Sequence, residues 1–287
     1  MIWKSTNTNG EHSFFNSKED LFKHLRENKE LLIDAKKSVI QKSVDKGSAV
    51  VSKCLDLLKF TDQLKGIKID DNFYYIAVNS TMILDSHDDL HDNGIWKKSV
   101  QEIQGKNYLV CDHELEVLQT ITRKEHIEIF TAKVPFSLIG QPYDGDTEIL
   151  VYKIPKNQIK LDAVKEWLDS GDSIEASVRM RYVTILLAMD SNNPEDETEK
   201  ANYDTYINKI ANKNDFEYIP YFYIIKEAQN VRESSLVVAG SNHATGLINN
   251  NKNQAEKSLE EIEAEKSLQT EQDAQKEMLK EILNKLN

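Results

Sequence analysis

The sequence predicts an α+β protein that is mainly β, with a central strand-rich domain, a partly helical N-terminal extension and a helical C-terminal tail. Segments rich in β-branched and aromatic residues recur between residues 72 and 248, and this composition is typical of strands. Helical spacing of apolar residues is found mainly outside that interval. A series of strands with few helices between them favours this class over alternating strand and helix units.

The central domain, residues 72–248, contains a series of six predicted strands, a further short apolar strand at 108–110 and one predicted helix. The helix covers residues 161–168, where apolar and charged residues alternate at helical spacing. Residues 190–200 are acidic and contain no apolar residue, which predicts a mobile loop. The strands of the series are predicted at residues 73–78, 126–132, 148–152, 177–187, 218–225 and 235–238.

Two extensions flank this domain. In the N-terminal extension, residues 1–71, apolar residues at helical spacing predict helices at 18–33 and 48–64. We expect them to serve as packing elements or an assembly arm. The C-terminal region, residues 249–287, begins as a polar linker and continues as a charged tail made of good helix formers. Its apolar seam is discontinuous, so it is either a solvated helix or a segment that binds a partner.

The composition excludes several classes of protein. A net charge of -12 argues against nucleic-acid binding, which needs clustered Lys and Arg. Neither a signal peptide nor an apolar run of roughly 20 residues is present, so we expect no membrane association and a cytoplasmic location. Two cysteines, Cys54 and Cys111, are too few for a disulfide framework and are expected to be reduced.

A histidine and a serine stand in distinctive surroundings. His113 follows an apolar strand at 108–110 and is flanked by Asp112 and Glu114. Ser177 opens a long strand soon after the turn at 169–172, which could place its hydroxyl near a sheet edge. Serine becomes a good nucleophile when a base such as histidine takes its proton, and the two can lie far apart in sequence.

In these segments the chain resembles the prohead proteases of tailed bacteriophages, which share a fold with the herpesvirus assemblins. The resemblance covers roughly residues 72–248 and departs from the family at two places. Arg179 replaces a glycine, and residues 239–242 replace a closing Pro-Ala-Asn-Pro. The matching segments, in order, are residues 85–91, 94–96, 112–113, 177–180 and 233–237.

The resemblance implies roles for individual residues. Ser177 would be the nucleophile, His113 the general base, and Glu233 the acid that orients the histidine. For Glu233, a surface acid beside its neighbour Arg232 is an equally open alternative. Ser173 is the alternative nucleophile, because it lies on the same face of an extended strand as Ser177. Two arginines on that face, at positions 179 and 181, could support an oxyanion or only pair with acids.

The resemblance also implies a fold and a function. The fold would be an assemblin-like β-barrel surrounded by short helices. The protein would be a serine endopeptidase that cleaves scaffold and major capsid protein precursors inside the assembling procapsid, in the host cytoplasm. It would act as a homodimer, cleave itself and need no cofactor. The alternative is a catalytically inactive structural or scaffolding protein on the same fold.

The residues themselves offer two other chemistries. On a helix, His87 and His91 would share one face and could bind Zn²⁺ with an acid or with His113. Acids surround them and a turn follows at residues 93–94, which favours a solvated acidic turn. Cys111 and His113 lie only two residues apart, whereas a thiol and its base normally come from separate elements, so a thiol protease is disfavoured.

Overall fold

The structure, a computed structural model, describes residues 3–6, 12–42, 70–171, 174–238, 242 and 244–248. The helix predicted at 48–64 and the tail at 249–287 lie outside the described residues. Within them, the chain is α+β with more residues in strands than in helices. The helices are α1 (Lys18–Glu27), α2 (Lys29–Ser38), α3 (Lys97–Ile103), α4 (Asp162–Ser170) and α5 (Glu197–Tyr206).

Three sheets organise the fold, with the strand orders β1-β2, β3-β10-β11-β6-β7 and β12-β4-β9-β8. In the second sheet β5 also pairs with β11. The described strands form no closed barrel, so the expected barrel is not seen in this part of the chain. The strands are β1 (Trp3–Thr6), β2 (His12–Phe15), β3 (Gln41–Lys42), β4 (Phe73–Ser80), β5 (Asp89–His91), β6 (Tyr108–Cys111), β7 (Thr120–Thr122), β8 (Glu128–Pro135), β9 (Asp146–Pro155), β10 (Glu175–Met189), β11 (Tyr221–Val237) and β12 (Gly246–Ile248).

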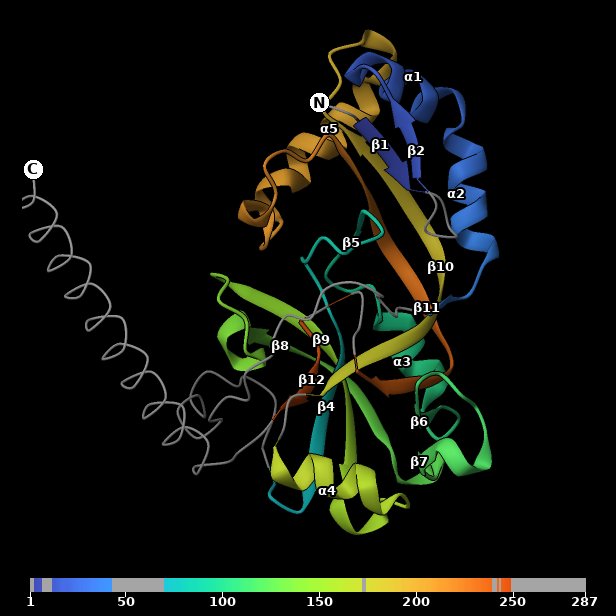
Figure 1. The fold of residues 1–287 in the computed structure, drawn as a ribbon, viewed down its shortest axis with the longest axis vertical. Coiled ribbons are helices and arrows are strands. Elements are labelled where there is room, and N and C mark those ends of the chain that lie inside the picture. Colours follow the sequence, from blue (N-terminus) through green and yellow to red (C-terminus); the bar gives the residue numbers. More distant parts are fainter. Residues whose placement is uncertain are drawn as a thin grey trace, which may run out of the picture.

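β10 and β11 are the longest of the described strands. They pair antiparallel along almost their whole length and run side by side between its two ends (Figure 1). The strands predicted at 218–225 and 235–238 are therefore one strand, β11, because the polar residues between them stay in the ladder with β10. The other four strands of the predicted series and the helix at 161–168 are confirmed as β4, β8, β9, β10 and α4.

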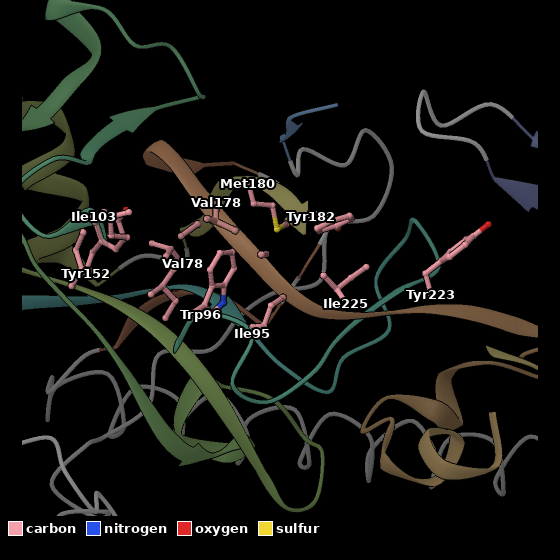
Figure 2. Close-up of a cluster of buried hydrophobic side chains, with 14 of the residues drawn as sticks. Val78, Ile95, Trp96, Ile103, Tyr152, Val178, Met180, Tyr182, Tyr223 and Ile225 are labelled. Carbon is pink, nitrogen blue, oxygen red and sulfur yellow. The ribbon is translucent and has the colours of Figure 1, made fainter. Parts of the chain in front are cut away.

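The main hydrophobic core lies between the sheets and includes the N-terminal helices. Figure 2 shows Trp96 near Val78, Val178 and Ile95 in this core. Three α1 side chains and one from α2 belong to the same cluster. The single helix predicted at 18–33 is two helices, separated at Asn28, whose backbone (φ -111°, ψ 11°) interrupts helical geometry. The α1 and α2 residues of the core are Leu21, Phe22, Leu25 and Ile33.

The acidic stretch at 190–200 is not the predicted mobile loop. A short 3-10 turn (Pro194–Asp196) leads into α5, and the acids of this stretch bind cations of the N-terminal helices. Arg26 on α1 contacts Asp196, which is completely buried, at 2.9 Å, and Lys29 on α2 contacts Glu199 at 2.6 Å. An acidic segment without cations nearby in the sequence is typical of a solvated loop. The prediction was wrong because the cations that bind these acids lie about 170 residues away in the sequence.

A buried ion pair also ties α2 to the central domain. Lys36 Nζ donates to Asp89 Oδ1 at 2.6 Å, and both side chains are almost fully buried. The hydroxyl of Tyr182 on β10 donates to the other oxygen of Asp89 at 2.9 Å. The Lys36 ammonium also lies 4.4 Å from the centre of the Tyr223 ring, which adds a cation–π contact. This pair joins an N-terminal helix to β5, β10 and β11.

Replacing Lys36 by methionine is expected to destabilise the protein by about 3–5 kcal/mol, because Asp89 would be left as a buried charge without its cation. Urea unfolding followed by circular dichroism measures the change. Lys165→Met is the matched control, since its i,i+4 pair with Asp169 is exposed and such pairs contribute only about 0–1 kcal/mol. Equal losses of stability in the two variants would contradict the assigned role of the buried pair.

Candidate active site

Three side chains that are far apart in sequence meet at one point of the six-stranded sheet. β11 lies between β6, with which it runs parallel, and β10, with which it runs antiparallel. Ser177 on β10 faces Ser235 on β11 in the ladder. Glu233 is carried by β11 itself, and His113 stands in the turn that follows β6. The strand order therefore brings these three positions together.

The three side chains form a continuous hydrogen-bonded relay. The Ser177 hydroxyl lies 2.8 Å from His113 Nε2, and His113 Nδ1 lies 2.9 Å from Glu233 Oε1. Ser177, His113 and Glu233 are 2%, 3% and 0% exposed. The glutamate oxygen, as acceptor at Nδ1, holds the ring proton there, so Nε2 is free to accept the hydroxyl proton. This tautomer is the one that can activate a serine.

A strained turn aims His113 at the other two residues. Asp112 and His113 both have left-handed backbone conformations, with φ of 50° and 59°; this region costs a non-glycine residue roughly 1–2 kcal/mol. Hydrogen bonds from β11 hold the turn. The Ser235 hydroxyl accepts from the His113 amide at 2.8 Å and donates to the Val110 carbonyl at 3.0 Å. The Asp112 amide donates to the Leu236 carbonyl at 3.0 Å.

Ser235 is thus a positioning residue that the sequence reasoning did not assign. It lies on β11 beside Ser234, and nothing in the sequence distinguishes the two hydroxyls. Only the parallel pairing of β6 with β11, which aligns Ser235 with Val110, reveals its role. Its hydroxyl fixes the backbone of His113 rather than touching the relay.

A bulge in β11 directs Glu233 toward His113. Between the pairs Val178–Ser234 and Met180–Asn230, one residue of β10 faces three residues of β11. Arg232, within this bulge, has a φ of 69°. Bulges re-aim side chains, and Glu233 is the last of the three β11 residues in this bulge. It is therefore not the surface acid left open as an alternative. Its Oε2 atom is buried and has no hydrogen-bond partner among the described residues.

The other candidates near Ser177 occupy different surroundings. Ser173 lies outside the described residues. Arg179 is half-buried on β10, and its Nε atom is buried without a hydrogen-bond partner in the described part of the chain. Arg181 is exposed. Cys111 is half-buried, and burial together with the charge of Asp112 raises the pKa of its thiol, so the nucleophilic thiolate is disfavoured.

The segment with His87 and His91 is not the predicted solvated acidic turn. His91 is buried. Its Nδ1 accepts a hydrogen bond from the side-chain amide of Asn79 at 2.9 Å, and its Nε2 lies 3.4 Å from the Tyr182 hydroxyl. Asp89 is buried through its pair with Lys36, a partner that the local sequence does not reveal. No group of three His, Cys, Asp or Glu residues is placed to hold a metal in the part of the chain that the structure describes.

Burial of His91 predicts a pH effect on stability. Burial lowers the pKa of the His91 imidazole from 6.5 to about 4. As the pH falls, this imidazole is therefore protonated in the unfolded chain before it is protonated in the folded one. The stability that His91 contributes is complete above pH 6.5 and is lost progressively toward pH 4. Urea unfolding at about pH 7 and about pH 4.5 should show that His91→Gln loses about 2 kcal/mol less than wild type across this range. Equal losses would contradict the assignment.

Residues 244–248 hold the beginning of β10 next to Ser177. The Thr245 hydroxyl accepts from the Ala176 amide at 3.1 Å and donates to the Ala176 carbonyl at 2.7 Å. Gly246 has a φ of 121°, and a Cβ there would collide with the Ile174 carbonyl oxygen. β12 then pairs with β4, so this segment joins the second large sheet to the strand that carries Ser177.

Gly246→Ala is expected to lower stability by about 1–3 kcal/mol, since the collision involves backbone atoms that can move only together with a strand. Urea unfolding measures the change. Gly94→Ala is the matched control, because Gly94 also has a positive φ (84°) while a Cβ there would have no described atom within 4 Å. A loss no greater than that of the control would show that the close approach at Gly246 is not important.

Comparisons with known proteins identify no relative of this chain. No family model, no curated protein and no solved structure matches this chain. Among the described residues, no helix is both long and apolar enough to cross a membrane. The geometry of the site fits the activation of a serine hydroxyl for attack on an electrophilic carbon.

Proposed function

We propose that this protein is a serine endopeptidase of the prohead-maturation kind, which cleaves scaffold and capsid precursors during assembly of a phage head. The observation that carries the proposal is the Ser177–His113–Glu233 relay, with contacts of 2.8 Å and 2.9 Å. A hydroxyl, an imidazole and a carboxylate in this order form a nucleophile, a base and a group that orients the base. The resemblance in residues 72–248 supplies the substrate class and the place of action, inside the procapsid in the host cytoplasm.

The proposed reaction follows from the positions of the protons. Ser177 Oγ attacks the carbonyl carbon of the scissile peptide while His113 Nε2 takes the hydroxyl proton. The imidazolium, stabilised by Glu233, then gives this proton to the leaving amine nitrogen as the C–N bond breaks, and an acyl-serine remains. Water attacks the acyl carbon, His113 takes the water proton and returns it to Ser177, and the carboxyl product leaves.

Arg179 is the proposed support for the oxyanion. It lies two positions after Ser177 on β10, and its Nε is buried without a partner in the described part of the chain. A cation that contacts the carbonyl oxygen only when negative charge forms on it stabilises the transition state, and this lowers the barrier to reaction.

The proposed fold, location and assembly follow the same resemblance. The fold would be of the assemblin type, and the active species would be a homodimer without a cofactor. Ser177 is only 2% exposed, so the site must open before a polypeptide reaches it. A covered nucleophile suits a protease that becomes active only after assembly has concentrated its substrates.

A fluorophosphonate probe tests the proposal, because it reacts with a serine only when a base activates that serine. Full-length protein is incubated with the probe alone and with the capsid and scaffold precursors, and tryptic mass spectrometry locates the label. We expect Ser177 to be labelled, His113→Ala to abolish the label, and the precursors to be cut. Absence of label and of cleavage in both conditions would overturn the proposal.

A structural or scaffolding role on the same fold is the second candidate. Two observations favour it: Arg179 stands where the resembled family has glycine, and Ser177 and His113 are nearly inaccessible. Under this alternative, wild type and Ser177→Ala would support head assembly equally, with all precursors intact. Incorporation of each variant into proheads, followed by intact-mass analysis, separates the two candidates.

A further inference from the structure

An exposed apolar run begins two residues after His113. The 3-10 turn Val117–Gln119 and the residues before it project large apolar side chains into solvent. Val238, directly after β11, is exposed as well. Such side chains are normally scattered singly, and a group of them marks an interaction site. Leu115, Val117, Leu118 and Val238 are 39%, 90%, 81% and 77% exposed.

Hydrogen bonds fix the backbone of this run, so its exposure is a defined feature of the turn. The Glu114 amide donates to the Cys111 carbonyl at 2.9 Å, and the Gln119 amide donates to the Glu116 carbonyl at 3.2 Å. The Thr120 hydroxyl also donates to the Glu116 carbonyl at 2.7 Å. β7 follows and pairs back onto β6. Both ends of the run are therefore anchored in the sheet that carries the relay.

The end of β11 reaches the same turn from the other side. The Asp112 amide donates to the Leu236 carbonyl at 3.0 Å, and Val238 is the second residue after Leu236. Two separate segments that carry exposed apolar side chains thus meet through the backbones of Asp112 and Leu236. We call Asp112, residues 114–118 and Val238 the rim.

The rim lies within reach of a polypeptide bound at the relay. Two residues of chain span at most about 7 Å and five span at most about 18 Å, so Leu115 and Leu118 lie within those distances of His113. An extended substrate advances about 3.3 Å per residue. Its side chains within roughly five residues of the scissile bond could contact the rim. The rim is therefore continuous with the proposed active site.

The rim is also acidic. Asp112, Glu114 and Glu116 alternate with its apolar residues, all three are exposed, and residues 112–118 contain no Lys or Arg. A surface of this kind favours a segment in which aliphatic residues stand beside basic ones, because aliphatic contacts remove apolar area from water and opposite charges select the register. Acidic segments would be repelled.

We propose that the rim is a substrate-docking site that takes an extended polypeptide segment carrying aliphatic side chains next to Lys or Arg, close to the scissile bond. This inference rests on the proposed protease function and adds its specificity. The occupant is the substrate chain, since rim residues directly flank the base that would act on it. The rim residues act on substrate choice, and the relay performs the chemistry.

A peptide library and the fluorophosphonate probe together test the rim. The library varies residues on both sides of the cleaved bond, and mass spectrometry reads the cleavage sites of wild type, Glu116→Lys and the double variant Val117→Ser/Leu118→Ser. We expect wild type to prefer aliphatic residues beside Lys or Arg. The double variant should lose about tenfold in kcat/KM for these peptides, mainly through KM. Glu116→Lys should shift the preference from basic toward acidic residues.

Controls separate failure of the rim from failure of the protease. Leu31→Ser and Glu30→Lys make the same changes on exposed positions of α2 and should behave as wild type. The probe should label Ser177 equally in all variants, because the relay is intact. Equal labelling with unchanged cleavage profiles would overturn the rim alone, whereas no labelling of wild type would overturn the protease. A change from dimer to monomer in Val117→Ser/Leu118→Ser, with unchanged cleavage, would assign the rim to a second copy and overturn its docking role.

Discussion

Ser177→Ala is expected to lower kcat for a cleaved capsid or peptide substrate by about 10⁵-fold or more, with an unchanged fold. Removing the nucleophile of a serine–histidine relay removes the covalent route, and such losses reach about 10⁶. The alanine leaves His113 bound to Glu233, and the hydroxyl occupies little volume, so we expect the same melting temperature. Initial rates and differential scanning calorimetry on the same preparations measure both quantities.

The matched control is Ser38→Ala, which removes a hydroxyl that donates to the Ala35 carbonyl on the exposed side of α2. It should leave the rate unchanged. Some acceleration over the uncatalysed reaction, about 10³–10⁴-fold, is expected to survive in Ser177→Ala through binding and oxyanion support. A Ser177→Ala rate within a few-fold of wild type would move the nucleophile elsewhere, with Ser173 as the first alternative.

The sequence predicted the three residues of the relay but not the strand arrangement that brings them together. Richness in β-branched and aromatic residues located the strand that carries Ser177, and an apolar run at 108–110 located the strand before His113. The order of short motifs selected these two residues among many. Alternation says which face a residue takes, and says nothing about which strands are neighbours. The position of β11 between β6 and β10 is a long-range outcome, and it is what brings the relay together.

Features that depend on distant partners could not be predicted. The left-handed turn at Asp112 and His113 is stable because Ser235 binds its backbone from β11. The bulge at Arg232 exists only in relation to β10. Asp196, just before α5, and Asp89 on β5 appeared solvated because their cations, Arg26 and Lys36, come from the N-terminal helices. In each case, tertiary contacts satisfy a group that local sequence leaves without a partner.

Glu233→Gln is expected to lower kcat by about 10³–10⁴-fold, since the corresponding change of acid to amide in a serine–histidine–aspartate relay costs about 10⁴. Glutamine has almost the same shape, so it can occupy the site. If its oxygen faces His113 Nδ1, the tautomer is kept but no negative charge stabilises the imidazolium. If its NH₂ group faces Nδ1, the ring proton moves to Nε2, and His113 cannot accept the Ser177 proton.

Stability distinguishes this role from a merely structural one. Glu233 is completely buried, and its Oε2 has no hydrogen-bond partner among the described residues. Burying a charge costs more than burying an amide, so Glu233→Gln should melt at the same temperature as wild type or higher while its activity falls. If the glutamate served only the packing of β11 against the turn after β6, activity and stability would fall together. Parallel measurement of kcat and melting temperature therefore decides whether the buried carboxylate is retained for catalysis at the expense of stability.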